Sequence, residues 1–375
     1  MKILIAGDFV PQYRTANQIE SGDYSCIDAV KPLTTQCDYS IVNFESPVVD
    51  GTAEPISKTG PNLRCHRNAL LAVKQAGFNC VTLANNHFYD YGEKGVRDTI
   101  AACKKMSVDY VGGGMNLEEA ESILYKECDG KTLAILNFCE NEWSIATETT
   151  GGSAPLHLTH NIRNIQNAKK NADYVLVIVH GGTEKYPLPT PRMKDVYRFF
   201  VEQGADAVVN HHQHCYSGYE VYQNKPIIYG LGNFCFDKNK PTDTNWNTGY
   251  VVVLDFSNEK KCFQLYPFIQ GGETPAVEFI NDPKNVFANI QHLNAIIADE
   301  EALKKAFETM ARSKTKLIEI FEPYKNKYLR LLQSKKIIPK TFSDKKKKQV
   351  LDLFRCESHR DIMFYLFKTR TEFSE

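Results

Sequence analysis

Short runs of apolar and β-branched residues alternate with segments of helical periodicity through the first two thirds of the chain. Strands are predicted at 2–6, 39–44, 79–83, 109–111, 131–138, 174–179, 207–210 and 226–229. Helices are predicted at 67–76, 95–106 and 193–203, and the last ends at a glycine. Two further runs, 250–256 and 262–269, flank Ser257 and Asn258, which predict a hairpin turn. This alternation is typical of α/β layer proteins.

The composition is that of a globular protein of 375 residues, with 42% hydrophobic and 24% charged residues. It excludes disordered, collagen-like and coiled-coil chains. The net charge is zero, which argues against a surface that binds nucleic acid or anionic membrane throughout. No run reaches the roughly 18–20 apolar residues of a transmembrane segment. The 11 cysteines are scattered without a C-x-x-C pair, so we expect reduced, mostly buried thiols and a cytoplasmic protein.

The character of the sequence changes after Asp282. Residues 281–375 contain no glycine and carry a net charge of +7, whereas residues 1–280 carry −7. We therefore predict a first domain at 1–280 and a basic helical extension at 281–375, which could dock on an acidic protein partner. The lysine run at 345–348 is interpreted as the solvated face of a helix, with a nucleic-acid or membrane contact as the alternative.

Polar side chains gather where five of the predicted strands end. The segments are GD at 7–8, NFESP at 43–47, ANNH at 84–87 followed by Asp90, HGGTE at 180–184 and NHHQH at 210–214. Open α/β sheets bind ligands at this edge. Because one residue separates His212 from His214, a strand exit would project both side chains to one side, where they could hold a metal. Imidazoles and carboxylates above an apolar floor suit divalent transition metals.

Each of these histidines, taken alone, fits a hydrogen-bonded structural role. Taken together with Asp8, Glu45 and Asn86, each at a strand end, they favour a metal site. The triple glycine at 112–114 lacks the lysine and hydroxyl residue of a phosphate-binding loop, so we interpret it as a turn.

Five other polar positions are interpreted individually. Asn233 is interpreted as fixing a loop, with a ligand contact as the alternative. Lys58 and Arg64 are interpreted as solvated, with an anionic substrate as the alternative partner. Glu184 and Glu220 stand near the predicted ligands in sequence, where a hydrogen bond to an imidazole N–H is the favoured role.

Seven segments in fixed order resemble the CapA-type capsule-biosynthesis family, which is associated with poly-γ-glutamate production and whose fold is similar to the calcineurin-like metallophosphoesterases. The matching text is GDF at 7–9, NFESP at 43–47, LANNHFYDYGEKG at 83–95, VGGGMNLEEA at 111–120, HGGTEKY at 180–186, GADAVVNHHQHCYSGYEVY at 204–222 and PIIYGLGNFCFD at 226–237. The resemblance covers roughly residues 1–255. It implies a metallophosphoesterase-like four-layer α/β/β/α sandwich, to which the helical C-terminal extension is added.

The resemblance also implies a cleft that binds one or two divalent metal ions, which we expect to be Mn, Fe or Zn. The implied ligands are Asp8, Glu45 as the bridging carboxylate, Asn86, His180, His212 and His214. His87 matches the histidine that lies over the leaving group, and Asp90 is the candidate to orient it. Two cations about 3.5–4 Å apart can activate a bridging water and clamp the attacking and leaving oxygens.

Two departures separate this chain from the phosphoesterases, and the capsule family shows the same changes. Val10 stands where the first phosphoesterase motif has a histidine, and Asn43-Phe44-Glu45 replaces the Gly-Asp of the second. The first metal thus loses a ligand, which leaves a single-metal site on Glu45, Asn86, His180 and His212 as the alternative.

Two functional hypotheses follow. The first is a metal-dependent hydrolase of a phosphoester, or of an amide in a polyglutamate-like polymer, in capsule or poly-γ-glutamate biosynthesis. The second is a non-catalytic assembly factor whose cleft binds an anionic polymer or a protein partner. A nucleic-acid partner is not expected, because the overall charge is neutral.

Overall fold

The computed structural model describes residues 1–128, 130–238, 244–257, 263–314, 326–335, 337 and 344–355. The chain forms two compact units, Met1–Phe307 and Glu308–Glu375. The first unit continues past residue 280 through helix α9 (Lys284–Ala298), which buries Ile290, Leu293 and Ile297. The division at 280 stays a prediction.

The larger of the two main sheets in the first unit has eight strands in the order β16-β15-β14-β1-β2-β3-β4, with β13 beside the end of β1. Its strands are β1 (Lys2–Phe9), β2 (Tyr39–Phe44), β3 (Cys80–Thr82), β4 (Asp109–Val111), β13 (Asn233–Cys235), β14 (Thr248–Asp255), β15 (Phe263–Ile269) and β16 (Glu278–Phe279). Strands β1 to β4 run parallel, and β14 to β16 are antiparallel.

The smaller sheet has six strands in the order β11-β12-β10-β9-β7-β6. They are β6 (Leu124–Cys128), β7 (Lys131–Cys139), β9 (Tyr174–His180), β10 (Ala207–His211), β11 (Tyr219–Tyr222) and β12 (Lys225–Ile228). The central four strands are parallel. The triple glycine bends at Gly112, where φ is +84°, and continues as β5 (Gly113–Gly114), which pairs with β8 (Gly152–Ser153).

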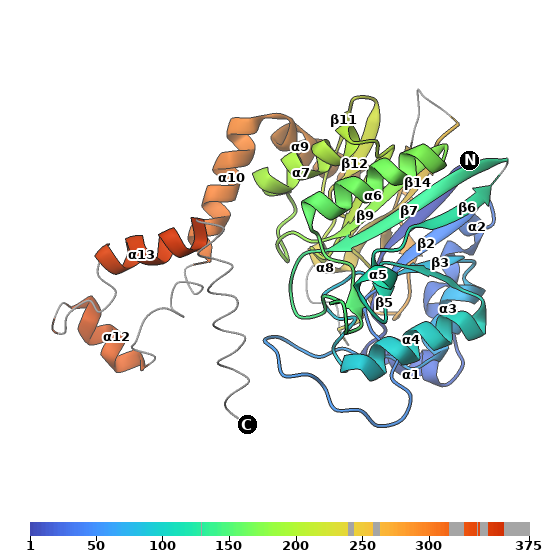
Figure 1. Ribbon diagram of the computed structural model, residues 1–375, viewed down its shortest axis with the longest axis horizontal. Coiled ribbons are helices and arrows are strands. Elements are labelled where there is room, and N and C mark those ends of the chain that lie inside the picture. The colour runs from blue at the N-terminus through green and yellow to red at the C-terminus, as the bar shows by residue number, and fades with distance from the viewer. Residues whose placement is uncertain are drawn as a thin grey trace. The chain divides into compact units, whose positions relative to one another are not determined.

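Helices cover the outer faces of both sheets (Figure 1). The larger sheet carries α1 (Tyr13–Glu20), α3 (Asn68–Gln75) and α4 (Gly92–Met106), and the smaller sheet carries α6 (Leu158–Asn171) and α7 (Pro191–Glu202). Shorter pieces are the 3-10 helix Ser25–Val30, α2 (Lys31–Thr34), α5 (Leu117–Ala120) and α8 (Thr244–Asn247). Towards the C-terminus lie α10 (Glu300–Ser313), α12 (Lys327–Ser334) and α13 (Asp344–Arg355), and the lysine run at 345–348 falls in α13.

The apolar core has two layers because the central strands bury both faces. Along β1, Ile3 and Ile5 pack between the two sheets, whereas Leu4 and Ala6 pack under the helices of the larger sheet. Side chains alternate along a strand, so one continuous apolar run supplies both layers. The predicted α/β/β/α sandwich is therefore confirmed.

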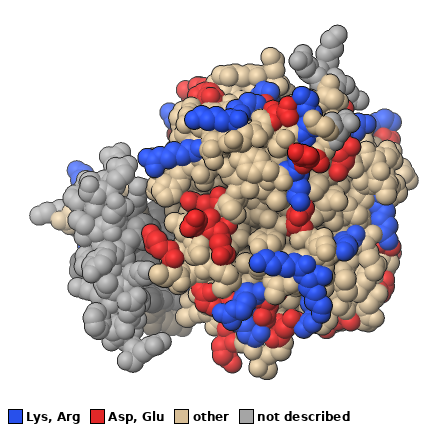
Figure 2. Space-filling view, turned by 45° about the vertical axis from the view of Figure 1, so that its right-hand side comes forward, with Lys and Arg blue, Asp and Glu red and all other residues tan. Residues whose placement is uncertain are grey.

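Parallel strands place the polar segments at one edge. Asp8 pairs in register with Asn43 of the neighbouring strand, and His211 pairs with His180 in the other sheet. On the face seen in Figure 2, positive and negative side chains are interspersed. The strand pairing itself thus brings the polar segments together.

Three further predictions can be compared with the structure. β14 and β15 form the predicted antiparallel pair, with Leu254 opposite Phe263; of the two turn residues, Asn258 lies outside the described residues. All nine cysteines in the described segments are free thiols, and seven are buried. Among the described helices, none combines the length and apolar character that crossing a membrane requires.

Candidate metal centre

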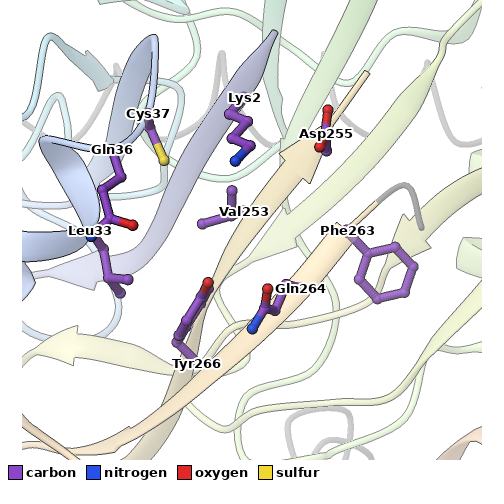
Figure 3. A pocket seen from close by; sticks show the side chains of 9 residues that line it. All are labelled: Lys2, Leu33, Gln36, Cys37, Val253, Asp255, Phe263, Gln264 and Tyr266. Carbon is purple, nitrogen blue, oxygen red and sulfur yellow. The ribbon is translucent and has the colours of Figure 1, made fainter. Parts of the chain in front are cut away.

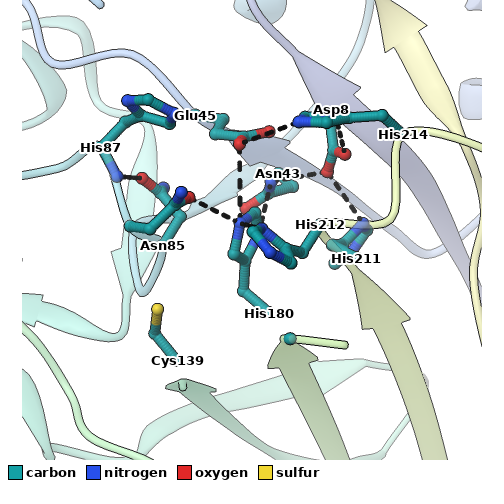
Figure 4. Close-up of polar contacts among 12 residues, drawn as sticks. Asp8, Asn43, Glu45, Asn85, His87, Cys139, His180, His211, His212 and His214 are labelled. Atoms are coloured by element: carbon teal, nitrogen blue, oxygen red, sulfur yellow. Dashed lines mark hydrogen bonds and ion pairs between the residues drawn. The ribbon is translucent and has the colours of Figure 1, made fainter. Parts of the chain in front are cut away.

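All the predicted site residues lie close to the carboxyl ends of strands from the two sheets. Each is buried, with 7% exposure or less: Asp8, Glu45, Asn86, His87, Asp90, His180, His212 and His214. Figure 4 shows the carboxylates of Asp8 and Glu45 facing the imidazoles of the other sheet. The side chains form two groups of metal-ligand atoms that share one carboxylate.

Group A consists of Asp8 on β1, Glu45 just after β2, and His214 beyond β10, and their ligand atoms lie within 4.8 Å of one another. Asp8 Oδ2 is 3.3 Å from His214 Nδ1, and Glu45 Oε1 is 3.8 Å from His214 Nε2. Asn233 Oδ1 is 2.9 Å from the same Nδ1. Because both neighbours of Nδ1 are acceptors, Nδ1 carries the proton and Nε2 is left to bind a metal.

Group B consists of Glu45, Asn86, His180 and His212. Three of its atoms surround His180 Nε2: Asn86 Oδ1 at 3.0 Å, His212 Nδ1 at 3.1 Å and Glu45 Oε1 at 3.5 Å. The two histidines and Glu45 lie within 4.8 Å of one another. Since His180 Nε2 holds at most one proton, it can donate one hydrogen bond only. A cation at this point could instead accept lone pairs from all four side chains.

Glu45 belongs to both groups and is the strongest sign of a bound cation. Its side chain is fully buried, and neither carboxyl oxygen has a hydrogen-bond partner among the described residues. Burial, and then the neighbouring negative charge of Asp8, raise its pKa well above the ordinary value. An unpaired buried carboxyl group is costly. A divalent cation between the two groups would remove that cost, so the residues fit the metal that the resemblance implies.

The pKa values of one residue in each group are shifted by burial and by neighbouring side chains. Burial alone would raise the pKa of Asp8, but the hydrogen bond and charge of His214 outweigh it, and the pKa is lowered. Burial and the neighbouring imidazole of His212 lower the pKa of His180 well below the ordinary value. A neutral imidazole is the form that binds a metal. Both shifts therefore favour the protonation states of metal ligands.

His212 and His214 reach different groups because the chain turns between them. β10 ends at His211, and the two histidines have φ angles of 92° and 55°, in the left-handed region. Strand alternation, the predicted cause of their convergence, therefore does not place them. Non-glycine residues in this region are rare and concentrate at functional sites.

His211 is the residue near the centre to which the sequence analysis gave no role. It is 2% exposed, and neither ring nitrogen has a hydrogen-bond partner in the described part of the chain. Its Nδ1 lies 3.5 Å from Asp8 Oδ1. Burial lowers the pKa of His211 to about 4, with the charge of Asp8 opposing the shift. Its place as the last residue of β10, in register with His180, is the signal that could have identified it.

Two asparagines hold the ligands in place. Asn43 Nδ2 donates to Asp8 Oδ1 at 2.8 Å and lies 3.3 Å from His180 Nδ1. Asn43 therefore links a residue of group A to a residue of group B. Asn233 Nδ2 donates to the backbone carbonyls of His214 and Trp246. The loop-fixing interpretation of Asn233 is thus the one that its contacts support.

Close backbone packing brings β13 behind Asp8. The Asp8 amide donates to Gly232 O at 3.2 Å, and a Cβ atom on Gly7 would lie 1.9 Å from that oxygen. Only glycine fits at position 7 without displacing one of the two backbone segments, at Gly7 and at Gly232. The main chain therefore couples Asp8 to the segment that carries Asn233.

His87 is held by Asp90. His87 Nδ1 is 2.6 Å from Asp90 Oδ2, and Lys58 forms an ion pair with the other carboxylate oxygen. The Lys58 side chain is only 3% exposed, so neither solvent nor a free anionic substrate is its partner. Arg64 is exposed and lies over the ring of Tyr91, at 5.7 Å from the ring centre.

Acidic side chains flank group B on its outer side. Glu142 accepts from Asn86 Nδ2 at 3.5 Å and lies 3.8 Å from His212 Nε2. Glu184 is exposed, and its charge acts on both Glu45 and His212. Glu220, in contrast, pairs with Arg198 and accepts from the Tyr229 hydroxyl. The predicted bond from Glu220 to an imidazole was wrong.

A separate cavity of about 210 Å³ lies at the other end of β1. Its lining includes Lys2, Cys37, Asp255 and Tyr266 (Figure 3). None of its lining residues belongs to group A or group B. The candidate metal centre is therefore identified by its ligand atoms, and this cavity is not part of it.

Comparison with known proteins gives both sequence and structural relatives. Residues 2–238 match the family described as bacterial capsule synthesis protein PGA_cap. The capsule biosynthesis protein CapA of Bacillus anthracis is 38% identical over 217 residues, which are 56% of this chain and 53% of that protein. The PGA biosynthesis protein CapA of Bacillus subtilis (strain 168) is 34% identical over 222 residues, 58% of each chain. This chain thus spans only a little more than half the length of these relatives.

Among solved structures, a novel phosphatase from Mycoplasma pneumoniae aligns with a TM-score of 0.43 and 13% identity. The alignment covers 77% of this chain and 98% of that structure.

Proposed function

This chain belongs to the PGA_cap family of bacterial capsule synthesis proteins, and on that basis we propose that it is a metal-dependent hydrolase in the biosynthesis of a capsule or poly-γ-glutamate polymer. The proposed substrate is an anionic phosphoester, with an amide of a polyglutamate-like polymer as the less favoured choice. The observation that carries the proposal is the buried, unpartnered carboxyl group of Glu45 between two sets of imidazole and carboxylate ligands.

The side chains divide the work. Asp8, Glu45 and His214 would hold one divalent ion, and Glu45, Asn86, His180 and His212 the other, with Mn, Fe or Zn as candidates. When bound, such ions activate water and stabilise negative charge on the substrate oxygens. Asn43 keeps Asp8 and His180 in place through its side-chain amide.

His87 supplies the proton in this proposal. Its Nδ1–H points to Asp90, so Nε2 is the atom that faces away from Asp90. When the ring carries a proton on both nitrogens, the proton on Nε2 can pass to a leaving oxygen, and the ring returns to its neutral Nδ1–H form. His87 follows Asn86 directly but is absent from both ligand groups. A purely structural metal site has no use for an oriented imidazole beside its ligands.

Elemental analysis of protein purified without chelator or histidine tag tests the metal site. We expect about two equivalents of Mn, Fe or Zn in the native protein, and a large loss in His212→Ala. His292→Ala, which removes an exposed histidine on α9, is the matched control and should keep the metal. No metal after reconstitution would refute the hydrolase mechanism.

A His87→Ala variant tests the assignment of the proton donor. Since His87 lies outside both ligand groups, metal content should be unchanged while turnover of a phosphoester falls about 10²- to 10⁴-fold, the range for general acid catalysis. Loss of metal in this variant would contradict the role given to His87.

The second candidate is a non-catalytic assembly factor with the same cleft. It is favoured by Val10, which leaves group A without the histidine of the phosphoesterases, and by the net charge of +7 on residues 281–375. We place the protein in the cytoplasm, with an acidic protein partner for the C-terminal helices. Replacing Lys346, Lys347 and Lys348 with glutamate in the full chain should then abolish pull-down of the partner, and retained binding would contradict this candidate.

A further inference from the structure

We propose that Lys58 is a positioning residue for His87. It acts through Asp90 to keep the imidazole proton on Nδ1 and to hold the loop between β2 and α3 beside the metal centre. This inference rests on the proposed function, because it assigns a role to His87 in that chemistry. Nothing in the sequence around Lys58 indicates the role, since the position lies in a long loop without apolar periodicity.

Lys58 turns inward from an exposed stretch of its loop. Its neighbours Ser57 and Thr59 are exposed, whereas the Lys58 side chain is 3% exposed and the Asp90 side chain is fully buried. Lysine is almost never buried unless it is paired. Burial of this side chain therefore indicates that the ion pair with Asp90 fixes the loop. The loop between β2 and α3 is drawn in blue in Figure 1.

The contacts of Asp90 assign a task to each of its oxygens. Oδ2 lies 2.6 Å from both His87 Nδ1 and the Leu63 amide, and Oδ1 forms the ion pair with Lys58. The Asp90 carbonyl accepts from the Ile56 amide at 2.9 Å. Three points of the loop are thus attached to the residue that orients His87.

The distances also decide where the imidazole proton lies. A carboxylate oxygen and an unprotonated ring nitrogen are both acceptors, so a separation of 2.6 Å requires a proton between Asp90 Oδ2 and His87 Nδ1. Lys58 Nζ is farther from Nδ1, at 3.3 Å, and is closer to Asp90 Oδ1. Lys58 therefore supports the Nδ1–H tautomer indirectly, by holding Asp90 in position as the acceptor of that proton.

Without the ammonium group, Asp90 would be a buried carboxylate with no cation beside it. Breaking a buried pair by removing one partner leaves an uncompensated charge. The carboxyl group would then rotate towards other donors, and the orientation of His87 would be lost. Direct contact between Lys58 and substrate is not needed for this effect.

The test uses Lys58→Met in the full-length, metal-loaded protein. Methionine keeps the length of the side chain and removes its charge. We expect unchanged metal content, a KM within about twofold of the native value, and a kcat lower by about 10- to 100-fold. This loss is smaller than the about 10²- to 10⁴-fold that general acid catalysis contributes, because the imidazole itself remains. The matched control is Lys94→Met, which breaks the pair with Asp98 on the surface of α4 and should change neither constant.

Nitrogen-15 NMR of labelled histidine gives a readout that does not depend on turnover. The His87 signals, identified by their absence in His87→Ala, should show the Nδ1–H tautomer in the native protein and a mixture in Lys58→Met. If the native protein hydrolyses no substrate, the proposed function fails, but the tautomer still tests Lys58. An unchanged tautomer in Lys58→Met, or an unchanged kcat in an active enzyme, would overturn the inference.

A second variant keeps the test valid if Lys58→Met folds poorly. Lys58→Met combined with Asp90→Asn removes both charges and should restore the melting temperature without restoring kcat. Recovery of native kcat in this double variant would show that Lys58 has a structural role only, and would also overturn the inference.

Discussion

Groups A and B differ in how completely the protein supplies their ligands. Group B has four side chains, three of which lie within 3.5 Å of His180 Nε2. Group A has three, with contacts of 3.3 and 3.8 Å to His214, and Val10 stands where the phosphoesterases have a histidine. The shared carboxylate of Glu45 therefore joins a set of four candidate ligands to a set of three. We expect group B to bind a metal more tightly than group A.

Glu45→Gln should have the largest effect, because both groups lose their shared negative charge. We expect elemental analysis to find almost no metal in this variant. If Glu45→Gln retained one tightly bound equivalent, the shared role of Glu45 would be refuted.

The same variant makes a prediction for metal-free protein. Because the folded-state pKa of Glu45 is raised, the stability that its neutral form provides is present in acid and is lost as the pH rises through that pKa. Metal-free Glu45→Gln should therefore melt at a higher temperature than metal-free native protein in alkaline buffer. If the difference in melting temperature between the metal-free variant and metal-free native protein were the same in acid and in alkali, this prediction would be contradicted.

His180→Ala should remove the metal of group B alone. Three contacts converge on His180 Nε2, so the affinity should fall by more than the about 10–100-fold that the loss of a supporting residue costs. Titration with Zn²⁺ should then show one remaining equivalent. If both equivalents disappeared, the two groups would not be separable and the comparison would fail.

Asp8→Asn should have a smaller effect, confined to group A. The substitution keeps the shape of the side chain but removes its charge, and group B has no ligand from β1. We expect the weaker of two Zn²⁺ equivalents to disappear while the tighter one is unchanged in calorimetry. A weakened tight site would place Asp8 in group B.

His211→Leu should have the smallest effect on metal and a favourable one on stability. Asp8 would lose a neighbour at 3.5 Å, so group A affinity should fall by about tenfold. Removing an imidazole whose nitrogens have no hydrogen-bond partner among the described residues should stabilise metal-free protein by about 1–3 kcal/mol. A destabilised His211→Leu protein in denaturant titration at pH 7 would contradict the unsatisfied state of His211.

The pH dependence of this variant follows from the same contact. The pKa of His211 is about 4 in the folded chain and near 6.5 in an unfolded one, so the native protein should lose stability as the pH falls from about 6.5 to 4. That part of the loss should be absent in His211→Leu.

Local pattern was enough for much of the fold. The bounds of β2 and β4 were predicted as observed, because each is a short run set off from its neighbours. β13 was missed, since three residues carry little pattern and its pairing with β1 is a long-range contact. The carboxyl ends of the strands, where the candidate ligands gather, could be predicted as the site, because parallel strands end together.

The missed features of the site depend on contacts that sequence spacing does not encode. Lys58 is distant in sequence from Asp90 and lies between the exposed Ser57 and Thr59, so its burial could not be predicted from its neighbours. The division of His212 and His214 between two groups results from left-handed backbone angles at both residues. The resemblance to the capsule family supplied the ligand set, but not the contacts of His211.

The contact between Gly7 and Gly232 limits how this site can evolve. Since a methyl group at position 7 would overlap the Gly232 carbonyl, any substitution there would displace the segment that holds Asn233, and with it the histidine of group A. Position 7 thus tolerates no residue other than glycine while group A is maintained. In a lineage that gave up the metal of group A, this glycine would be among the first residues released from selection.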